Sequence, residues 1–271
     1  MIKVLQCSCP RSGSYGLFSL LRYIMKEEGI YKTYMLESGI GAIVKDHFMK
    51  YASFPLWYEV DNIEISNNKL YFSFMNPNKN NNLIEVNSNI LFDSSNLMWT
   101  HDKPSVIKSS IMSDITHAFY IVRDGRSVVN SMINYVTSPI AILANPQYNI
   151  TDTSDIFNNE ELFASYVKTW SEHIDSYKSN KNKYLLIKAE YLKSYVSKAA
   201  EDICEYMAIN LDLSNIKDYV GYKVLSKQAP NHILIKNNKW QDNFSKRNVE
   251  IFKDIAGDNL INMGYVTDNN W

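Results

Sequence analysis

The chain has 271 residues with 28 basic and 29 acidic side chains, and 45% of its residues are hydrophobic. This length and composition predict one α/β domain over residues 1–271, and the balanced charge argues against a protein that binds nucleic acid through a broad basic face. Three cysteines cannot form a paired disulfide framework, and no apolar run reaches about 18 residues. We therefore expect a cytoplasmic protein with reduced thiols, no signal peptide and no membrane contact.

The first 26 residues predict a strand, a polar turn and a helix. Residues 2–7 are typical of a buried parallel strand, residues 10–14 of a tight turn, and residues 15–26 of an amphipathic helix. The first amides of a helix have no intrahelical acceptor, and the helix dipole adds partial positive charge at that end. The turn is therefore a candidate site for a phosphate or sulfate group.

The side chains of this turn support the same interpretation. Gly13 allows the backbone to approach an anion closely, Ser12 and Ser14 supply hydroxyl donors, and Arg11 supplies a fixed cation. The nucleoside triphosphate motif G-x-x-x-x-G-K-[ST] is not met, because its first glycine is missing and no lysine follows Gly13. An ordinary ATPase or kinase is therefore disfavoured.

A second strand is expected at residues 31–36, followed by a helix at residues 40–51. Glu37 would then follow the strand and point into the crevice at the carboxyl edge of the sheet, or it would simply cap the next helix. Residues 62–66 and 70–74 alternate around an Asn-Asn pair and predict a β-hairpin. The hairpin lies in a segment, at about residues 54–98, that we expect to be an insertion beside the sheet, with an exposed loop at residues 76–82.

The next predicted strands lead to three further polar residues that are candidates for the site. Residues 97–100 lead to His101, whose imidazole titrates near neutrality and suits removal of a proton from a hydroxyl or amine. Residues 118–123 predict a strand and residues 127–135 the start of a helix, with a turn between them. Arg123 at the edge of this strand and Ser131 two turns into the helix are expected to meet over one anion.

The rest of the chain continues the alternation of strands and helices. A loop or lid is expected at residues 136–160, helices at residues 162–177 and 198–208, and a buried strand at residues 184–187. This order is typical of an α/β fold with a parallel sheet.

Four segments resemble sulfotransferases that use 3'-phosphoadenosine 5'-phosphosulfate (PAPS). The turn at residues 9–14 is similar to their 5'-phosphosulfate loop, and Thr-His-x-x-Pro at residues 100–104 to the segment with their histidine base. The pattern R-D-x-R-x-x-x-x-S at residues 123–131 is similar to their 3'-phosphate site. Residues 237–265 resemble the C-terminal region of bacterial members. The resemblance implies a three-layer α/β/α fold with a central parallel sheet of the P-loop nucleotide-kinase type.

The resemblance also assigns roles to single residues. His101 or Glu37 would be the general base, because related carbohydrate sulfotransferases use a glutamate after the first helix, and Arg11 would stabilise charge on the transferred group. The residues expected to bind the nucleotide are Arg11, Ser12, Gly13, Ser14, Tyr15, Arg123, Ser131, Lys236, Lys239 and Trp240. The chain departs from the family at Trp99, where a lysine is frequent, and at Ala189, where a tyrosine that contacts adenine is frequent.

We therefore expect direct in-line transfer of a sulfuryl group from PAPS to a hydroxyl or amine of a small molecule or carbohydrate. By analogy with phosphoryl transfer, the protein positions the reactants and stabilises the developing charge, and no metal is required. One alternative is a catalytically weak protein that retains the nucleotide site, and another is a P-loop kinase that acts on a small molecule. A homodimer is possible.

Overall fold

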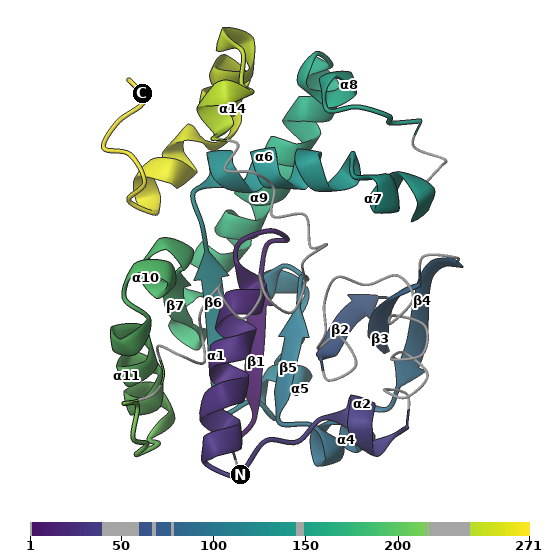
Figure 1. Ribbon diagram of the computed structural model, residues 1–271, viewed down its shortest axis with the longest axis vertical. Helices are drawn as coiled ribbons and strands as arrows, with labels where there is room; N and C mark the ends of the chain where they lie inside the picture. Colours follow the sequence, from purple (N-terminus) through teal and green to yellow (C-terminus); the bar gives the residue numbers. More distant parts are fainter. Residues whose placement is uncertain are drawn as a thin grey trace.

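The computed structural model describes residues 2–39, 60–66, 69–76, 79–144, 149–214, 216 and 239–271. Its centre is a seven-stranded sheet with the order β4-β3-β2-β5-β1-β6-β7 (Figure 1). The strands are β1 (Val4–Ser8), β2 (Asp61–Ser66), β3 (Lys69–Asn76), β4 (Lys79–Val86), β5 (Leu97–Thr100), β6 (His117–Val122) and β7 (Leu185–Lys188).

The strand β1 lies in the middle of the parallel part of the sheet. It pairs in parallel with β5 on one side and with β6 on the other, so that Val4 is in register with Leu97 and with His117. The strands β2 and β7 extend this parallel arrangement at either side, and β3 and β4 add an antiparallel edge. The segments that follow β1, β5, β6 and β7 consequently start at the same edge of the sheet.

Helices cover both faces of the sheet, which confirms the predicted three-layer α/β/α fold. Successive side chains of β1 alternate between two cores: Val4 belongs to the core that includes α1 and α11, whereas Leu5 belongs to the core that includes α6, α9 and α14. The helices are α1 (Ser14–Glu27), α2 (Tyr34–Glu37), α4 (Ser88–Ser94), η2 (Pro104–Val106), α5 (Ser109–Met112), α6 (Gly125–Val136), α7 (Pro139–Ala144), α8 (Ser154–Phe157), α9 (Glu160–Lys178), η4 (Lys181–Lys183), α10 (Ala189–Ser194), α11 (Val196–Met207), η5 (Trp240–Asp242) and α14 (Lys246–Asn262).

Close packing explains the glycine at the start of α6. A Cβ atom on Gly125 would lie 2.6 Å from the ring of Trp170 in α9. The missing side chain therefore lets the indole lie directly against the α6 backbone. This contact fixes the beginning of α6 relative to α9, and α6 carries Ser131.

The predicted strand at residues 31–36 is wrong, because Tyr34–Glu37 forms the short helix α2. The buried carboxylate of Asp61 determines this outcome. It accepts hydrogen bonds from the Thr33 hydroxyl (2.8 Å) and from the backbone amides of Tyr34 (2.9 Å) and Met35 (3.1 Å), so these amides are not available to pair with a neighbouring strand. The predicted helix at residues 40–51 lies outside the described residues.

The predicted hairpin is confirmed, but its place in the fold differs from the prediction. The strands β2 and β3 pair antiparallel up to Ser66 and Lys69, while β2 also pairs in parallel with β5, so the segment extends the sheet rather than lying beside it. The exposed loop predicted at residues 76–82 is wrong, because β3 continues to Asn76 and pairs there with Lys79 of β4. Strong turn formers in this stretch are outweighed by pairing with an adjacent strand.

The predicted loop or lid at residues 136–160 contains two short helices, α7 and α8, in its described part. The other predicted elements are confirmed to within about two residues, namely β1, α1, β6, α6, α9, β7 and α11.

Candidate active site

The turn between β1 and α1 has the backbone of an anion-binding loop. Gly13 has φ = 90° and immediately precedes α1, and Arg11 has φ = 67°, a left-handed conformation that is uncommon for a residue with a side chain. The Ser12 side chain is 1% exposed, and its hydroxyl has no hydrogen-bond partner among the described residues. A buried hydroxyl without a partner beside the amino end of a 14-residue helix fits an anionic ligand.

The two motifs that the sequence assigns to different ends of one nucleotide lie side by side. The Arg11 side chain donates from Nε to the Ser131 hydroxyl at 3.1 Å, and Arg123 Nη1 reaches the Arg11 carbonyl oxygen at 3.5 Å. The guanidinium of Arg11 also lies over the ring of Tyr135, 5.0 Å from its centroid. Burial lowers the pKa of Arg11, and the positive charge of Arg123 lowers it further. This arrangement gathers positive charge at one point, which an anion would stabilise.

His101 follows β5 and lies against the same turn. Its Nδ1 atom is 3.0 Å from the carbonyl oxygen of Ser8, and a carbonyl oxygen can only accept a hydrogen bond. Nδ1 therefore carries the proton, and Nε2 keeps its lone pair available as a base. Burial, together with a smaller effect of the positive charge of Arg11, lowers the pKa of His101 to about 4, so the ring is neutral at pH 7.

Two serines connect His101 to the beginning of α1. The Ser8 hydroxyl lies 3.2 Å from His101 Nδ1 and 2.6 Å from the hydroxyl of Ser14. The buried Gln6 adds a further hydrogen bond from its amide nitrogen to the Ser14 carbonyl at 2.7 Å. The imidazole and the first turn of α1 are therefore held in one hydrogen-bonded unit.

Trp240 packs against Arg126 of the R-D-x-R-x-x-x-x-S motif at residues 123–131. Arg126 is 8% exposed, forms a bidentate ion pair with Asp124, and packs against the rings of both Trp240 (4.7 Å) and Trp271 (4.6 Å). The Asp124 carboxylate also accepts the Arg126 amide and thereby caps α6. The exposed Lys239 directly precedes Trp240.

The structure does not bring Glu37 to the other predicted site residues. Glu37 lies on α2, which packs near α4 at the edge where β2 and β5 begin, whereas Arg11 and His101 lie where β1 and β5 end (Figure 1). Tyr15 is partly buried in α1 and packs on the core of that face of the sheet. Lys236 lies outside the described residues.

Two residues of the site were missed by the sequence analysis. Tyr135 stands four residues after Ser131 in α6, so the helical period alone would have placed both on one face. His173 in α9 donates to the carbonyl oxygen of His101, a contact between residues 72 positions apart for which the sequence contains no local signal.

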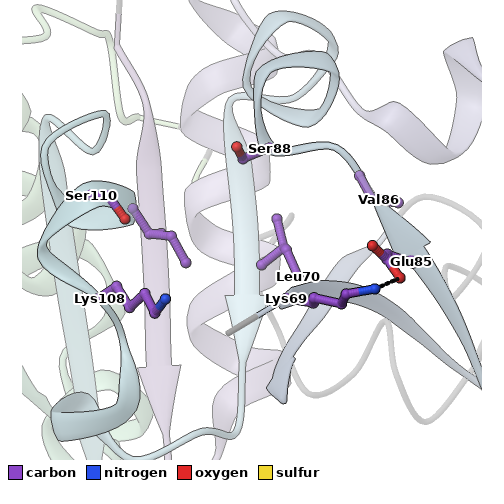
Figure 2. A pocket seen from close by; sticks show the side chains of 8 residues that line it. Lys69, Leu70, Glu85, Val86, Ser88, Lys108 and Ser110 are labelled. Carbon is purple, nitrogen blue, oxygen red and sulfur yellow. Dashed lines mark hydrogen bonds and ion pairs between the residues drawn. The ribbon is translucent and has the colours of Figure 1, made fainter. Parts of the chain in front are cut away.

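A cavity of about 200 Å³ lies away from this site, between the β3–β4 hairpin and the α4 and α5 segments (Figure 2). Lys69 at its rim is paired with Glu85 at 2.7 Å, so the charge of this lysine is balanced. None of the predicted nucleotide-binding residues lines it, and it is not a second candidate for the anion site. The lining residues are Lys69, Leu70, Glu85, Val86, Ser88, Lys108, Ser110 and Ile111.

Within the described parts of the chain, no helix combines the length and the apolar character needed to cross a membrane. In the same residues, histidine, cysteine and carboxylate side chains do not gather in groups of three or more that would hold a metal ion.

Comparison with known proteins agrees with this geometry. The sulfotransferase domain family matches residues 2–263. A search of curated protein sequences finds no significant match. Mouse sulfotransferase SULT7A1 complexed with PAP is similar in structure, with a TM-score of 0.57 and 14% identity over 97% of this chain and 86% of that chain. Retinol dehydratase in complex with androsterone and inactive cofactor PAP has a TM-score of 0.57 and 17% identity over 95% of this chain and 80% of that chain.

Retinol dehydratase in a complex with retinol and PAP is similar to the same degree, with a TM-score of 0.56, 16% identity, and coverage of 95% of this chain and 81% of that chain. At these identities the solved structures show a shared fold. The family match extends over nearly the whole chain, and the chain therefore belongs to the sulfotransferase domain family.

Proposed function

We propose that this protein transfers a sulfuryl group in line from PAPS to a hydroxyl or amine of a small molecule or carbohydrate, in a single domain over residues 1–271. Membership of the sulfotransferase family supports the class of reaction. The contact that supports this donor most directly is the hydrogen bond of 3.1 Å between Arg11 and Ser131. It joins the 5'-phosphosulfate-type turn to the 3'-phosphate-type motif, as a nucleotide with phosphates at both positions requires.

The residues at the first turn fit the end of the donor that reacts. PAPS supplies the sulfuryl group and the phosphate that leaves with the nucleotide. The unpartnered hydroxyl of Ser12, the helix-terminal amides after Gly13 and the guanidinium of Arg11 would hold these oxygens. Because the donors are already fixed by the fold, they stabilise charge that develops during transfer without reorganising.

The second group of residues fits the 3'-phosphate. Arg123 and Ser131 converge on Arg11, and Lys239 would add a cation from the C-terminal segment. The presence of this second anion site is the reason to prefer PAPS over ATP as the donor. We assign Trp240 to packing on Arg126 and not to stacking on adenine.

We assign the proton-accepting role to His101. Its Nδ1–H group is held by the Ser8 carbonyl, so Nε2 is free to accept the proton of the attacking hydroxyl or amine. A pKa of about 4 makes the imidazole a weak base but keeps it unprotonated at every physiological pH. Glu37 is not a candidate on this geometry, because α2 lies at the opposite edge of the parallel strands.

We also propose a cytoplasmic location, which the free thiols support. Cys7, Cys9 and Cys204 are free and buried, and burial raises the pKa of each thiol, which keeps them protonated and unreactive.

The donor can be tested by thermal shift with adenosine 3',5'-bisphosphate and, separately, with ADP and magnesium. We expect the bisphosphate to raise the melting temperature and ADP with magnesium to have little effect. Preferential stabilisation by ADP with magnesium would instead support the small-molecule kinase. Transfer itself is then measured with radiolabelled PAPS and a panel of phenols, alcohols, amines and sugars.

The base is tested with two matched substitutions in a transfer reaction found in that screen. We expect His101→Gln to reduce the rate by a factor of about 10² to 10⁴ while the bisphosphate still binds. Glu37→Gln should leave the rate unchanged. A reversed result would overturn the assignment of the base, and an unchanged rate in both variants would remove acid–base catalysis by either residue.

A further inference from the structure

The carbonyl group of His101 is held by a second, deeply buried histidine. His173 in α9 is 2% exposed, and its Nε2 atom lies 3.1 Å from the His101 carbonyl oxygen. The Tyr120 hydroxyl lies 2.9 Å from His173 Nδ1. Since the carbonyl can only accept, His173 Nε2 donates to it and Nδ1 accepts from Tyr120, so the two contacts fix one tautomer of His173.

The same face of α9 holds the residues that follow His101. The Ser176 hydroxyl accepts a hydrogen bond from the Ser105 amide at 2.7 Å, and Glu172 forms an ion pair with Lys103. Positions 172, 173 and 176 lie within one turn of the helix. The segment from residue 101 to residue 105 is therefore attached to α9 at three points.

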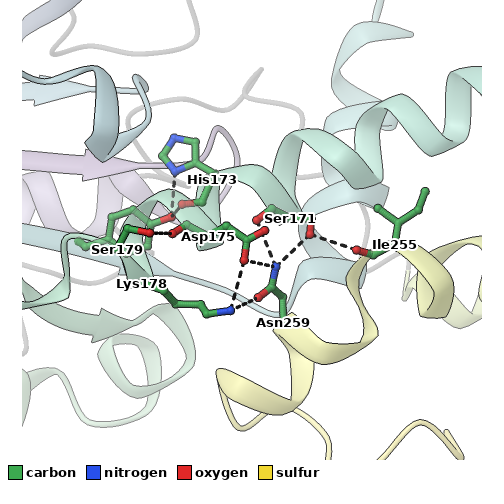
Figure 3. A network of polar contacts seen from close by, with 8 residues as sticks. Ser171, His173, Asp175, Lys178, Ser179, Ile255 and Asn259 are labelled. Atoms are coloured by element: carbon green, nitrogen blue, oxygen red, sulfur yellow. Dashed lines mark hydrogen bonds and ion pairs between the residues drawn. The ribbon is translucent and has the colours of Figure 1, made fainter.

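The helix α9 is itself fixed from its other side by α14. The amide nitrogen of Asn259 donates to the Ser171 hydroxyl (2.9 Å), to the Ser171 carbonyl (3.2 Å) and to Asp175 (3.1 Å), and Lys178 donates to the Asn259 side-chain oxygen (3.0 Å) (Figure 3). Figure 3 shows Ser171, His173, Asp175 and Lys178 along the same stretch of α9, with Asn259 of α14 beside them. A polar group buried as deeply as the Asn259 amide is stable only because its hydrogen bonds are satisfied.

Burying a histidine costs more free energy of hydration than burying an apolar side chain that fills the same space. Burial lowers the pKa of His173 to about 4, and an apolar side chain of similar size would avoid the loss of hydration. Both ring nitrogens of His173 form hydrogen bonds, and one of these bonds is to the carbonyl oxygen of His101, the proposed base. The geometry therefore indicates a role in orientation.

We propose that His173 is a positioning residue for sulfuryl transfer, which holds the His101 peptide so that the imidazole donates from Nδ1 to Ser8 and presents Nε2 to the acceptor. This inference rests on the proposed function, in which His101 is the base. His173 acts through His101 and does not contribute to nucleotide binding.

The test compares His173→Gln, which retains a donor at the position of Nε2, with His173→Leu, which removes it. His117→Gln is the matched control, because His117 lies at the beginning of β6, away from the site. We expect His173→Leu to lower kcat on the order of a hundredfold, the effect of a reacting group displaced by about 1 Å. The affinity for adenosine 3',5'-bisphosphate should not change, His173→Gln should recover most of the rate, and the control should match the parent.

A second measurement does not depend on turnover. Imidazole ¹⁵N chemical shifts report which ring nitrogen carries the proton, and the chain has five histidines to assign. We expect the Nδ1–H form of His101 in the parent protein and in His173→Gln, and a mixture of tautomers in His173→Leu. If His173→Leu does not fold, Tyr120→Phe removes the hydroxyl that fixes the His173 tautomer, and it should lower kcat by a smaller factor.

A folded His173→Leu protein with the parent kcat and an unchanged His101 tautomer would overturn this inference. That result differs from a failure of the proposed function. If His101→Gln leaves a demonstrated transfer intact, His101 is not the base, and the proposed role of His173 in transfer is then wrong as well. The tautomer measurement would still show whether His173 fixes the orientation of the His101 ring.

Discussion

Replacement of Arg11 by glycine is expected to slow transfer about a hundredfold, with a smaller loss of stability than Arg11→Ala causes. Arg11 has φ = 67°, and this left-handed conformation costs about 1–2 kcal/mol for a residue with a Cβ atom. Glycine avoids that cost but loses roughly 0.4–1 kcal/mol through the greater freedom of its unfolded chain. The glycine variant should therefore be about 1 kcal/mol more stable than the alanine variant, although both have lost the same side-chain contacts.

The effect on activity should be the same in the two variants, because both lose the guanidinium. Arg11 provides a preorganised cation beside Ser131, and removal of one such donor costs on the order of 3 kcal/mol in the transition state, or about a hundredfold in rate. Arg11→Lys keeps the charge but loses the planar fork, so it should retain part of the rate.

Urea unfolding gives the stability of the two variants, and radiolabelled transfer gives their rates. The reasoning is refuted if the alanine variant is the more stable of the two, because Arg11 would then not be held in a strained conformation. It is also refuted if either variant transfers sulfate at the parent rate.

Three further outcomes follow from the same structure. Arg123→Ala should weaken the binding of adenosine 3',5'-bisphosphate by roughly tenfold to a hundredfold and leave the binding of AMP unchanged in calorimetry, because only the former has a 3'-phosphate. Gly13 has φ = 90°, and a Cβ atom there would lie 3.1 Å from the Cβ atom of Ala189, so Gly13→Ala should bind the bisphosphate more weakly. Gly29→Ala is the control: Gly29 has φ = 71° and no neighbour within 4 Å of a new Cβ atom, so this variant should lose stability but keep its affinity for the bisphosphate. The fold lowers the pKa of His173 from 6.5 to about 4, so on going from pH 7 to pH 5 the unfolded chain takes up a proton that the folded protein does not. Over this range the parent should lose about 2 kcal/mol more of its free energy of unfolding than His173→Gln, as measured by urea unfolding. Equal losses would contradict this account.

The parts of the site that lie on continuous segments were predictable from the sequence. The turn around Gly13 and the strand before Arg123 are each a local unit, in which one hydrophobic run, one turn and one helix determine the conformation. The convergence of Arg11, Arg123 and Ser131 also follows from local information, because parallel strands end at one edge of a sheet.

Contacts between distant segments were not predictable in this way. The helix α2 forms because Asp61, 27 positions after Tyr34, accepts its first amides, and no pattern near Glu37 indicates that partner. The extension of β3 and β4 through an asparagine-rich stretch likewise depends on an adjacent strand, which outweighs the turn preference of the residues themselves. His173 belongs to the same class, since its partner His101 lies on another element.

The strand order divides the molecule at β1. On one side are β6, β7 and α6, with Arg123 directly after β6 and Ser131 on α6, and on the other are β5 and the β2–β4 extension. His101, at the end of β5, stands at the boundary between these two parts. Replacing the β3–β4 hairpin on the outer side of β2 is therefore expected to leave the contacts among Arg11, Arg123 and Ser131 unchanged, because all three residues lie on or beyond β1 in the strand order.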